Sequence, residues 1–482
     1  MTANKSTVIN GLLWAFLDQF SSKGISIIVS IILARILSPE DFGMMGLIYF
    51  FTAIAQELVD GGLSSSLIRS ENSDTKDYST IFVTNVVISF IIYAILFFIA
   101  PYFSAYYDMP VLEPILKVYG LIFIINAFST VQLTLLSKEL KFRKIMLINI
   151  PGLCVGSLVA VWLASKDYGV WSIVYMQLIT QIITAIILWI KNKEIKLFFS
   201  YAILKKHFDF GFKIMLSSIV NAIFRNLSNI VIGKSYSVKE LGYFERARTL
   251  SMYPSYVFVG VLSKVFYPVF SKIKDQTELT NAYKNVLNVS FYITFGALLL
   301  LAAIAYPIFG LVLGEKWLFA VPFFQLFCLR AAIHPLQVFN LNILKVKGLS
   351  NKLLRIEFLN RLLGFAALCI GLFFNLYWLV VILTISDFIA YFNNIIATQN
   401  YHHYRLKDQI KDFSPTIAIT IISFLACYAI HEYSGISQLS WTNIGLQASV
   451  YIALYLFLSI VFKNKNFLYI LATIRSKIPS KK

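Results

Sequence analysis

The sequence predicts an all-α polytopic membrane protein with about 14 transmembrane helices, in two pseudo-symmetric six-helix lobes followed by two C-terminal helices. Composition supports this, because apolar residues form 58% of the chain and charged residues 14%, against roughly 25% charged in soluble domains. Apolar runs of about 20 residues, the length that crosses a bilayer, recur along the chain. An internal repeat of a polar helix indicates two related halves.

The apolar runs divide the chain into successive predicted spans. They lie near residues 10–36, 40–63, 78–100, 112–137, 146–165, 170–190, 209–234, 240–263, 285–306, 318–344, 353–373, 376–399, 413–431 and 442–462.

The spans group into domains. We expect an N-terminal lobe at 1–190 and a C-terminal lobe at 209–400, joined by a cytoplasmic linker at 191–208. Two accessory spans follow within 401–462. In the tail, 463–482, apolar residues recur at helical spacing among Lys and Arg. This predicts a basic amphipathic helix on the inner membrane surface.

The first and seventh spans carry the same polar stripe. Polar residues recur at every fourth position, which places each set on one helix face. A polar face is costly against lipid, so both helices are predicted to line a wet cavity, as in a transporter. The stripe residues are Asp18, Ser22, Ser26 and Ser30, and, 199 positions later, Ser217, Asn221, Arg225 and Asn229.

The charge distribution predicts topology. The net charge is +18, and with an inside N-terminus most Lys and Arg fall in inside segments or at their edges. The positive-inside rule then places both termini in the cytoplasm. The basic excess is therefore assigned to topology, and no nucleic-acid partner is expected. The four cysteines each lie inside an apolar run without paired spacing, so no metal site is predicted.

Short segments at the span ends resemble a known family. They are Leu-Ala-Arg-Ile-Leu-Ser-Pro-Glu-Asp-Phe-Gly at 33–43, Asp-Gly-Gly-Leu-Ser at 60–64, Leu-Ile-Arg at 67–69, Phe-Arg at 142–143 and Leu-Gly-Tyr-Phe at 241–244. These hairpin signatures resemble bacterial polysaccharide flippases of the Wzx/RfbX-like branch of the MOP exporter superfamily, of the WzxC and TuaB type.

The resemblance implies a V-shaped, MATE-like architecture. It implies that the protein flips an undecaprenyl-pyrophosphate-linked oligosaccharide across the bacterial inner membrane for O-antigen, capsule or exopolysaccharide synthesis. Two lobes would alternate access around a cationic cavity. Membrane lipids, a polysaccharide polymerase and glycosyltransferases are the implied partners. The family has no catalytic motif to carry over, so no catalytic residue, enzyme activity or cofactor is expected.

Cationic side chains within the spans are the candidates for substrate binding, since a diphosphate needs a hydrated, positive path through hydrocarbon. Arg225 leads, because guanidinium suits phosphate oxygens; its alternative is structural pairing with an acid. Arg246 and Arg248 either extend the path, or one of them pairs with Glu245. The other candidates for the cavity lining are Asn221, Asn229, Arg330 and Lys23.

Three acids within the spans are candidates for H⁺ or Na⁺ coupling: Asp18, Asp60 and Asp387. Asp18 has an alternative role as counter-ion to Lys23 or Arg225. A solvated position at a helix end is the alternative for Asp60.

Other functions stay open. A multidrug exporter of the same superfamily would favour an acidic cavity. A lipid II flippase would share the cavity chemistry but not the hairpin signatures. A polytopic glycosyltransferase or polymerase would need acids at an outer loop or a large outside loop, whereas the outside loops predicted here are short.

Overall fold

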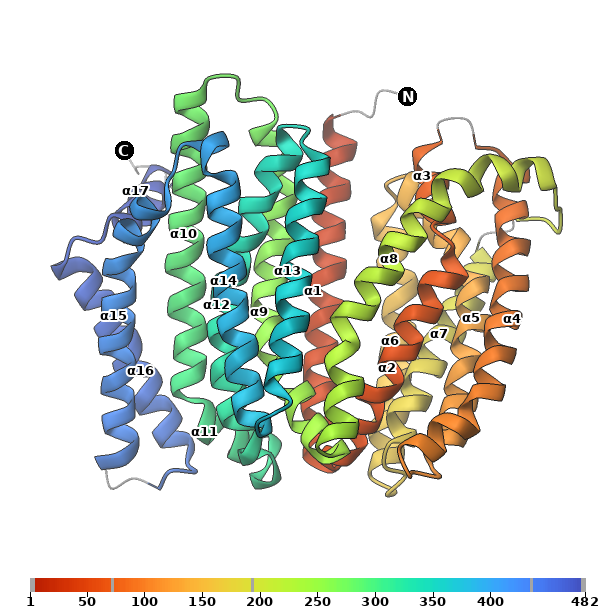
Figure 1. Ribbon diagram of the computed structural model, residues 1–482, viewed down its shortest axis with the longest axis horizontal. Coiled ribbons are helices and arrows are strands. Elements are labelled where there is room, and N and C mark those ends of the chain that lie inside the picture. The colour runs from red at the N-terminus through yellow and green to blue at the C-terminus, as the bar shows by residue number, and fades with distance from the viewer. Residues whose placement is uncertain (1–4, 71–72, 192–194, 434–436, 478–482) are drawn as a thin grey trace. The chain divides into compact units, whose positions relative to one another are not determined.

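The computed structural model describes residues 5–70, 73–191, 195–433 and 437–477, and these contain helices and no strand (Figure 1). The side chain of Asp18 lies outside the described part. The helices are α1 (Lys5–Ile36), α2 (Pro39–Asp60), α3 (Leu63–Arg69), α4 (Thr75–Tyr106), α5 (Leu112–Lys138), α6 (Phe142–Ala164), α7 (Trp171–Lys191), α8 (Tyr201–Ser235), α9 (Val238–Phe270), α10 (Gln276–Ala303), α11 (Ala305–Ile308), a π-helical turn η1 (Phe309–Leu313), a 3₁₀ turn η2 (Glu315–Ala320), α12 (Val321–Val346), α13 (Ser350–Gly371), α14 (Leu376–His402), α15 (Leu406–Tyr433), α16 (Trp441–Val461) and α17 (Lys465–Lys477).

Within the described residues, 11 helices are long and apolar enough to cross a membrane. The other three predicted spans, near 10–36, 240–263 and 353–373, fall on α1, α9 and α13, which are also long helices. The predicted all-α polytopic membrane fold is therefore confirmed.

The chain forms two compact units, Met1–Gly242 and Tyr243–Lys482. In the first, α1 packs on α6, and α8 packs on α2, α3 and α4. The helix expected to open the C-terminal lobe thus belongs to the first unit. The predicted lobe boundaries themselves stay a prediction.

The repeated hairpin signatures contact each other inside the first unit. Ser38 caps α2, accepting a hydrogen bond from the Asp41 amide at 3.2 Å, and Ser237 likewise accepts from the Glu240 amide at 3.1 Å. A Cβ on Gly43 would lie 1.8 Å from the Val238 carbonyl oxygen, and a Cβ on Gly242 would lie 1.8 Å from that of Pro39. Since Val238 and Gly242 are the repeat counterparts of Pro39 and Gly43, the contact is reciprocal.

In the second unit, α10 holds the accessory helices through tyrosines. The Tyr451 hydroxyl donates to the Gly296 carbonyl at 2.8 Å, and the Tyr455 hydroxyl donates to the Tyr292 carbonyl at 2.7 Å. The tail begins as the helix α17, and its Phe467 packs against the buried cluster that contains Tyr292, Tyr451 and Tyr455. A buried hydroxyl is stabilised when it has a hydrogen-bond partner. The contact between α10 and α16 is therefore held by specific hydrogen bonds as well as by apolar packing.

Candidate functional site: a polar cavity in the first unit

A cavity of about 410 Å³ lies between α2, α5 and α8. Each helix contributes residues at i, i+3, i+4 spacing, so one continuous face of each is turned inward. Its lining is Tyr49, Thr52, Ala53, Gln56 and Glu57 from α2, Tyr119, Ile122, Phe123 and Asn126 from α5, and Ala222, Arg225 and Asn226 from α8.

Polar groups of the lining fix one another. The Asn126 side-chain amide donates to the Gln56 side-chain oxygen at 3.1 Å, which joins α5 to α2. The Asn226 amide donates to the Ala222 carbonyl at 2.9 Å, within α8. The cavity wall therefore presents amide and hydroxyl groups of the kind that hydrogen-bond to sugars and phosphates.

The charges on this lining are opposite in sign. Arg225 is exposed on α8, and Glu57 is half-buried on α2. Among the residues described around the cavity, Arg225 is the basic one and Glu57 the acidic one, so this stretch of wall has no excess of basic groups. The predicted cationic cavity stays a prediction.

The rest of the α8 stripe is placed differently from Arg225. Asn229 is fully buried, and its side-chain amide donates to the Gly46 carbonyl on α2 at 2.9 Å. Asn221 is half-buried and is not among the lining residues described above. Of the predicted polar stripe on this helix, Arg225 faces the cavity and Asn229 joins two helices.

Two predicted cations lie on α9 in the second unit. The Arg248 guanidinium pairs with Glu245 at 2.6 Å, which is the local pairing left open from the sequence. Arg246 is 3% exposed, and its guanidinium carbon lies 6.0 Å from the Trp317 ring centroid. Packing over an aromatic ring stabilises a cation that has little access to water.

Arg330 and Asp387 form an ion pair between α12 and α14. The Gln337 side chain donates to the Asp387 backbone carbonyl at 2.8 Å, which adds a second link between these helices. The structure therefore brings a predicted substrate-binding cation together with a predicted coupling acid. As placed here, each neutralises the other.

The remaining predicted residues are spread over the first unit. Lys23 is half-buried on α1. Asp60 ends α2, is half-buried and accepts a hydrogen bond from the Ser64 hydroxyl; both its coupling role and the solvated helix-end alternative stay predictions. For Asp18, only the backbone of α1 is described.

Glu57 was missed by the sequence reasoning, although a signal was present. Tyr49, Thr52, Gln56 and Glu57 recur at helical spacing within one predicted span. The acid that the sequence analysis selects on this span is Asp60. The intramembrane acid one turn earlier is the one that reaches the cavity.

The fold defines a polytopic, all-helical membrane protein, and comparison with known proteins narrows the class. Residues 32–322 match the family described as "Polysaccharide biosynthesis protein". The match spans more than half of the chain, so the protein belongs to this family. The resemblance to polysaccharide-biosynthesis membrane proteins of the WzxC and TuaB type is thereby confirmed.

Individual relatives agree. The chain is 26% identical to the lipopolysaccharide biosynthesis protein WzxC of Escherichia coli (strain K12), over 67% of each chain. It is 23% identical to the teichuronic acid biosynthesis protein TuaB of Bacillus subtilis (strain 168), over 89% of this chain and 90% of that one. The solved inward-closed structure of the lipid II flippase MurJ covers 93% of this chain and 98% of its own, at 16% identity and a TM-score of 0.75. At that identity the likeness shows the fold alone.

Proposed function

We propose that the protein flips an undecaprenyl-pyrophosphate-linked oligosaccharide across the bacterial inner membrane for surface polysaccharide synthesis. Both termini would be cytoplasmic, and two lobes would alternate access. The observation that carries the proposal is that exposed Arg225 lines a polar cavity walled by three membrane-length helices. The cavity volume is within the roughly 300–1,000 Å³ of small-molecule sites. It suits a diphosphate with its first sugar.

The assigned roles follow from the chemistry of the lining. Arg225 binds phosphate oxygens, because guanidinium donates two parallel hydrogen bonds to them. Gln56, Asn126 and Asn226 bind sugar hydroxyls. The polyprenyl chain stays in lipid, where no polar group needs desolvation. The polymerase and glycosyltransferases of the same pathway are the proposed partners, and transport without catalysis is the proposed activity.

Arg225→Ala tests this proposal in cells lacking the native gene. We expect a loss of surface polysaccharide of about ten- to hundredfold, the worth of a charge-assisted hydrogen bond, with lipid-linked intermediate accumulating inside. Arg225→Lys should be intermediate, since it keeps charge but loses the paired geometry. Arg355→Ala, an exposed arginine on α13, is the matched control. Normal polysaccharide in an Arg225→Ala strain that contains the protein would refute the proposal.

An exporter of organic cations is the second candidate, because Glu57 faces the same cavity. A carboxylate attracts a cationic drug and repels a diphosphate. The two functions therefore assign opposite roles to Arg225 and Glu57.

A further inference from the structure

The chain from residue 195 to residue 207, which leads into α8, is held near both of its ends. Ile195 is buried in a core cluster with Leu67 and Tyr78, and the Lys196 backbone amide donates to the Ser79 hydroxyl at 3.1 Å. At the other end, in the second turn of α8, His207 is 1% exposed. Figure 1 shows the first turns of α8 beside α3 and the start of α4, which they contact.

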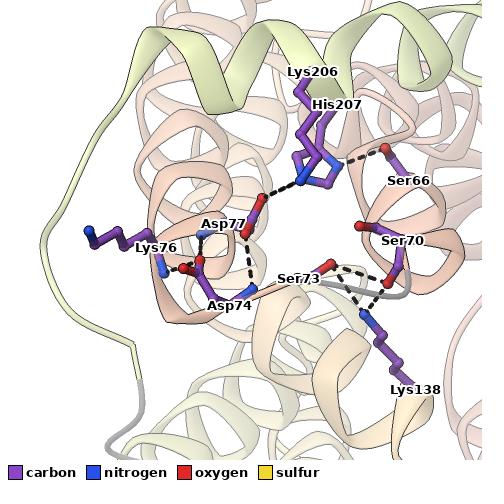
Figure 2. Close-up of polar contacts among 9 residues, drawn as sticks. All are labelled: Ser66, Ser70, Ser73, Asp74, Lys76, Asp77, Lys138, Lys206 and His207. Atoms are coloured by element: carbon purple, nitrogen blue, oxygen red, sulfur yellow. Dashed lines mark hydrogen bonds and ion pairs between the residues drawn. The ribbon is translucent and has the colours of Figure 1, made fainter.

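His207 is held by hydrogen bonds to two other helices (Figure 2). Its Nε2 lies 2.9 Å from the Asp77 carboxylate on α4, and its Nδ1 lies 2.8 Å from the Ser66 hydroxyl on α3. A carboxylate only accepts, so Nε2–H donates to Asp77, while Nδ1 and the Ser66 hydroxyl form the second hydrogen bond. Lys206 adds an ion pair to Asp77 at 3.3 Å.

This Ser66–His207–Asp77 chain has the order of a hydrolytic triad but not its access. Ser66 is 6% exposed and Asp77 is 5% exposed, so a substrate does not reach the hydroxyl. Asp77 also accepts from the Asp74 amide at 2.9 Å, in the capping box that begins α4. The arrangement anchors α8 to the ends of α3 and α4.

Between the two anchors the chain turns large apolar side chains outward. Leu197 is 88% exposed and Tyr201 is 72% exposed, with Phe198 and Phe199 at 40% and 52%. Exposed lysines border them, and the Lys76 ammonium lies 5.8 Å from the Phe198 ring centroid. We call this surface the basic–apolar ridge: Lys76, Lys196, Leu197, Phe198, Phe199, Tyr201, Lys205 and Lys206.

We propose that the basic–apolar ridge binds the anionic phospholipid headgroups of the bilayer. The position of the ridge along the membrane-length helices supports this partner. Lys76 lies in the first turn of α4 and Tyr201 begins α8, and both helices are long enough to cross a membrane. Residues at such helix ends meet the headgroup layer, where aromatic rings and lysines are favoured. The charge is complementary to an anionic leaflet. Its four lysines outnumber the two exposed acids beside them, Asp74 at the start of α4 and Asp209 on the next turn of α8.

The ridge has a consequence for α8 as a whole. The anchors prevent the segment from folding away, so headgroup binding acts directly on the helix that also carries Arg225. Anionic lipid would thereby fix the depth of the helix that lines the cavity. This binding depends on the membrane surface and not on which cargo the cavity takes.

Hydrogen exchange of the full-length protein in lipid nanodiscs tests the proposal. The amides of 197–206 are compared in discs of phosphatidylcholine and in discs of equal parts phosphatidylcholine and phosphatidylglycerol. We expect exchange to slow by about threefold or more in the anionic discs, and the difference to vanish near 1 M salt, where the Debye length is about 3 Å.

Charge variants identify the source of the effect. Lys196→Gln with Lys205→Gln should remove most of the difference between the discs; Lys206 is left because it pairs with Asp77. The matched control is Lys166→Gln with Lys239→Gln, two exposed lysines outside the ridge, which should keep the difference. Equal exchange in both discs, or a difference that survives the ridge variant, would overturn the proposal. So would protection that needs an added soluble protein, which would assign the ridge to a protein partner.

Discussion

Glu57 distinguishes the two candidate functions at the scale of single residues. If the cargo is a diphosphate lipid, Glu57→Gln removes a repulsion, and we expect polysaccharide export within about threefold of the native level or above it. If the cargo is an organic cation, the same change abolishes export. Measuring surface polysaccharide and drug efflux in one Glu57→Gln strain decides between the two cargoes. Loss of surface polysaccharide in that strain, with the protein present in the membrane, would count against the assigned roles.

The Arg330–Asp387 pair is expected to stabilise the second unit. Asp387→Ala leaves a guanidinium without its partner, a change that costs about 3–5 kcal/mol when fully buried. These side chains are 22% and 33% exposed, so we expect about 1–3 kcal/mol, read as a lower unfolding temperature in detergent. Combining Arg330→Met with Asp387→Ala should restore much of the lost stability. If Asp387→Ala unfolds like the native protein, the pair has another role, such as releasing Arg330 to a phosphate.

At the scale of elements, the reciprocal glycine contact determines how closely two hairpins approach. Gly43→Ala or Gly242→Ala places a methyl group 1.8 Å from a carbonyl oxygen, which requires backbone displacement. We expect a loss of about 1–3 kcal/mol of stability or more. Gly364→Ala on α13, where nothing lies within 4 Å, is the control and should be neutral or gain about 0.5–1 kcal/mol. Equal behaviour of the three variants in thermal unfolding would contradict the contact.

The histidine anchor of α8 gives a second prediction at this scale. His207→Ala leaves the buried groups of Ser66 and Asp77 short of a partner, which costs about 1–3 kcal/mol. Lys205→Ala, two positions earlier and exposed, should change stability little. Limited proteolysis near residue 200 reports the effect, and a cleavage rate unchanged from native in His207→Ala would remove the anchor role.

Hydropathy predicts where most of the helices lie, but it does not predict the residue at which each helix begins. The apolar run predicted a span at 78–100, whereas α4 begins at Thr75 because the Asp74–Asp77 capping box extends it through polar residues. The separate helix α3 was not predicted. It follows Gly61 and Gly62, whose φ of 56° and 66° break the chain direction after α2. Such turns depend on local backbone geometry, which an apolar average does not register.

The site was predictable only in part, for a physical reason. Periodicity showed that Arg225 and Asn229 share a polar face, but not which of them meets another helix. The Asn229 side-chain amide donates to the carbonyl of Gly46, 183 positions away, and His207 bonds to Asp77, 130 positions away. Hydrogen bonds between distant segments decide which polar residues join helices, and one sequence carries no direct record of them.

At the scale of the whole molecule, membrane-length helices surround polar groups that lipid alone would not tolerate. The outward passage of an anionic headgroup is favoured by an inside-negative potential, by about 2.3 kcal/mol per charge per 100 mV. Moving such a cargo therefore does not demand ion coupling, and coupling through Asp18, Asp60 or Asp387, which would reset the carrier, stays a prediction. Asp387, paired with Arg330, is the one with a described counter-ion in the second unit.

The proposed role of Arg225 is to bind the diphosphate of a lipid-linked glycan as the glycan crosses the bilayer. Proteoliposomes that hold the purified protein and a fluorescent undecaprenyl-pyrophosphate oligosaccharide test this role, with transbilayer movement read by an impermeant quencher. We expect protein-dependent flipping that falls about ten- to hundredfold in Arg225→Ala and persists in Arg355→Ala. Flipping at the native rate by Arg225→Ala, or none by the folded native protein, would contradict it.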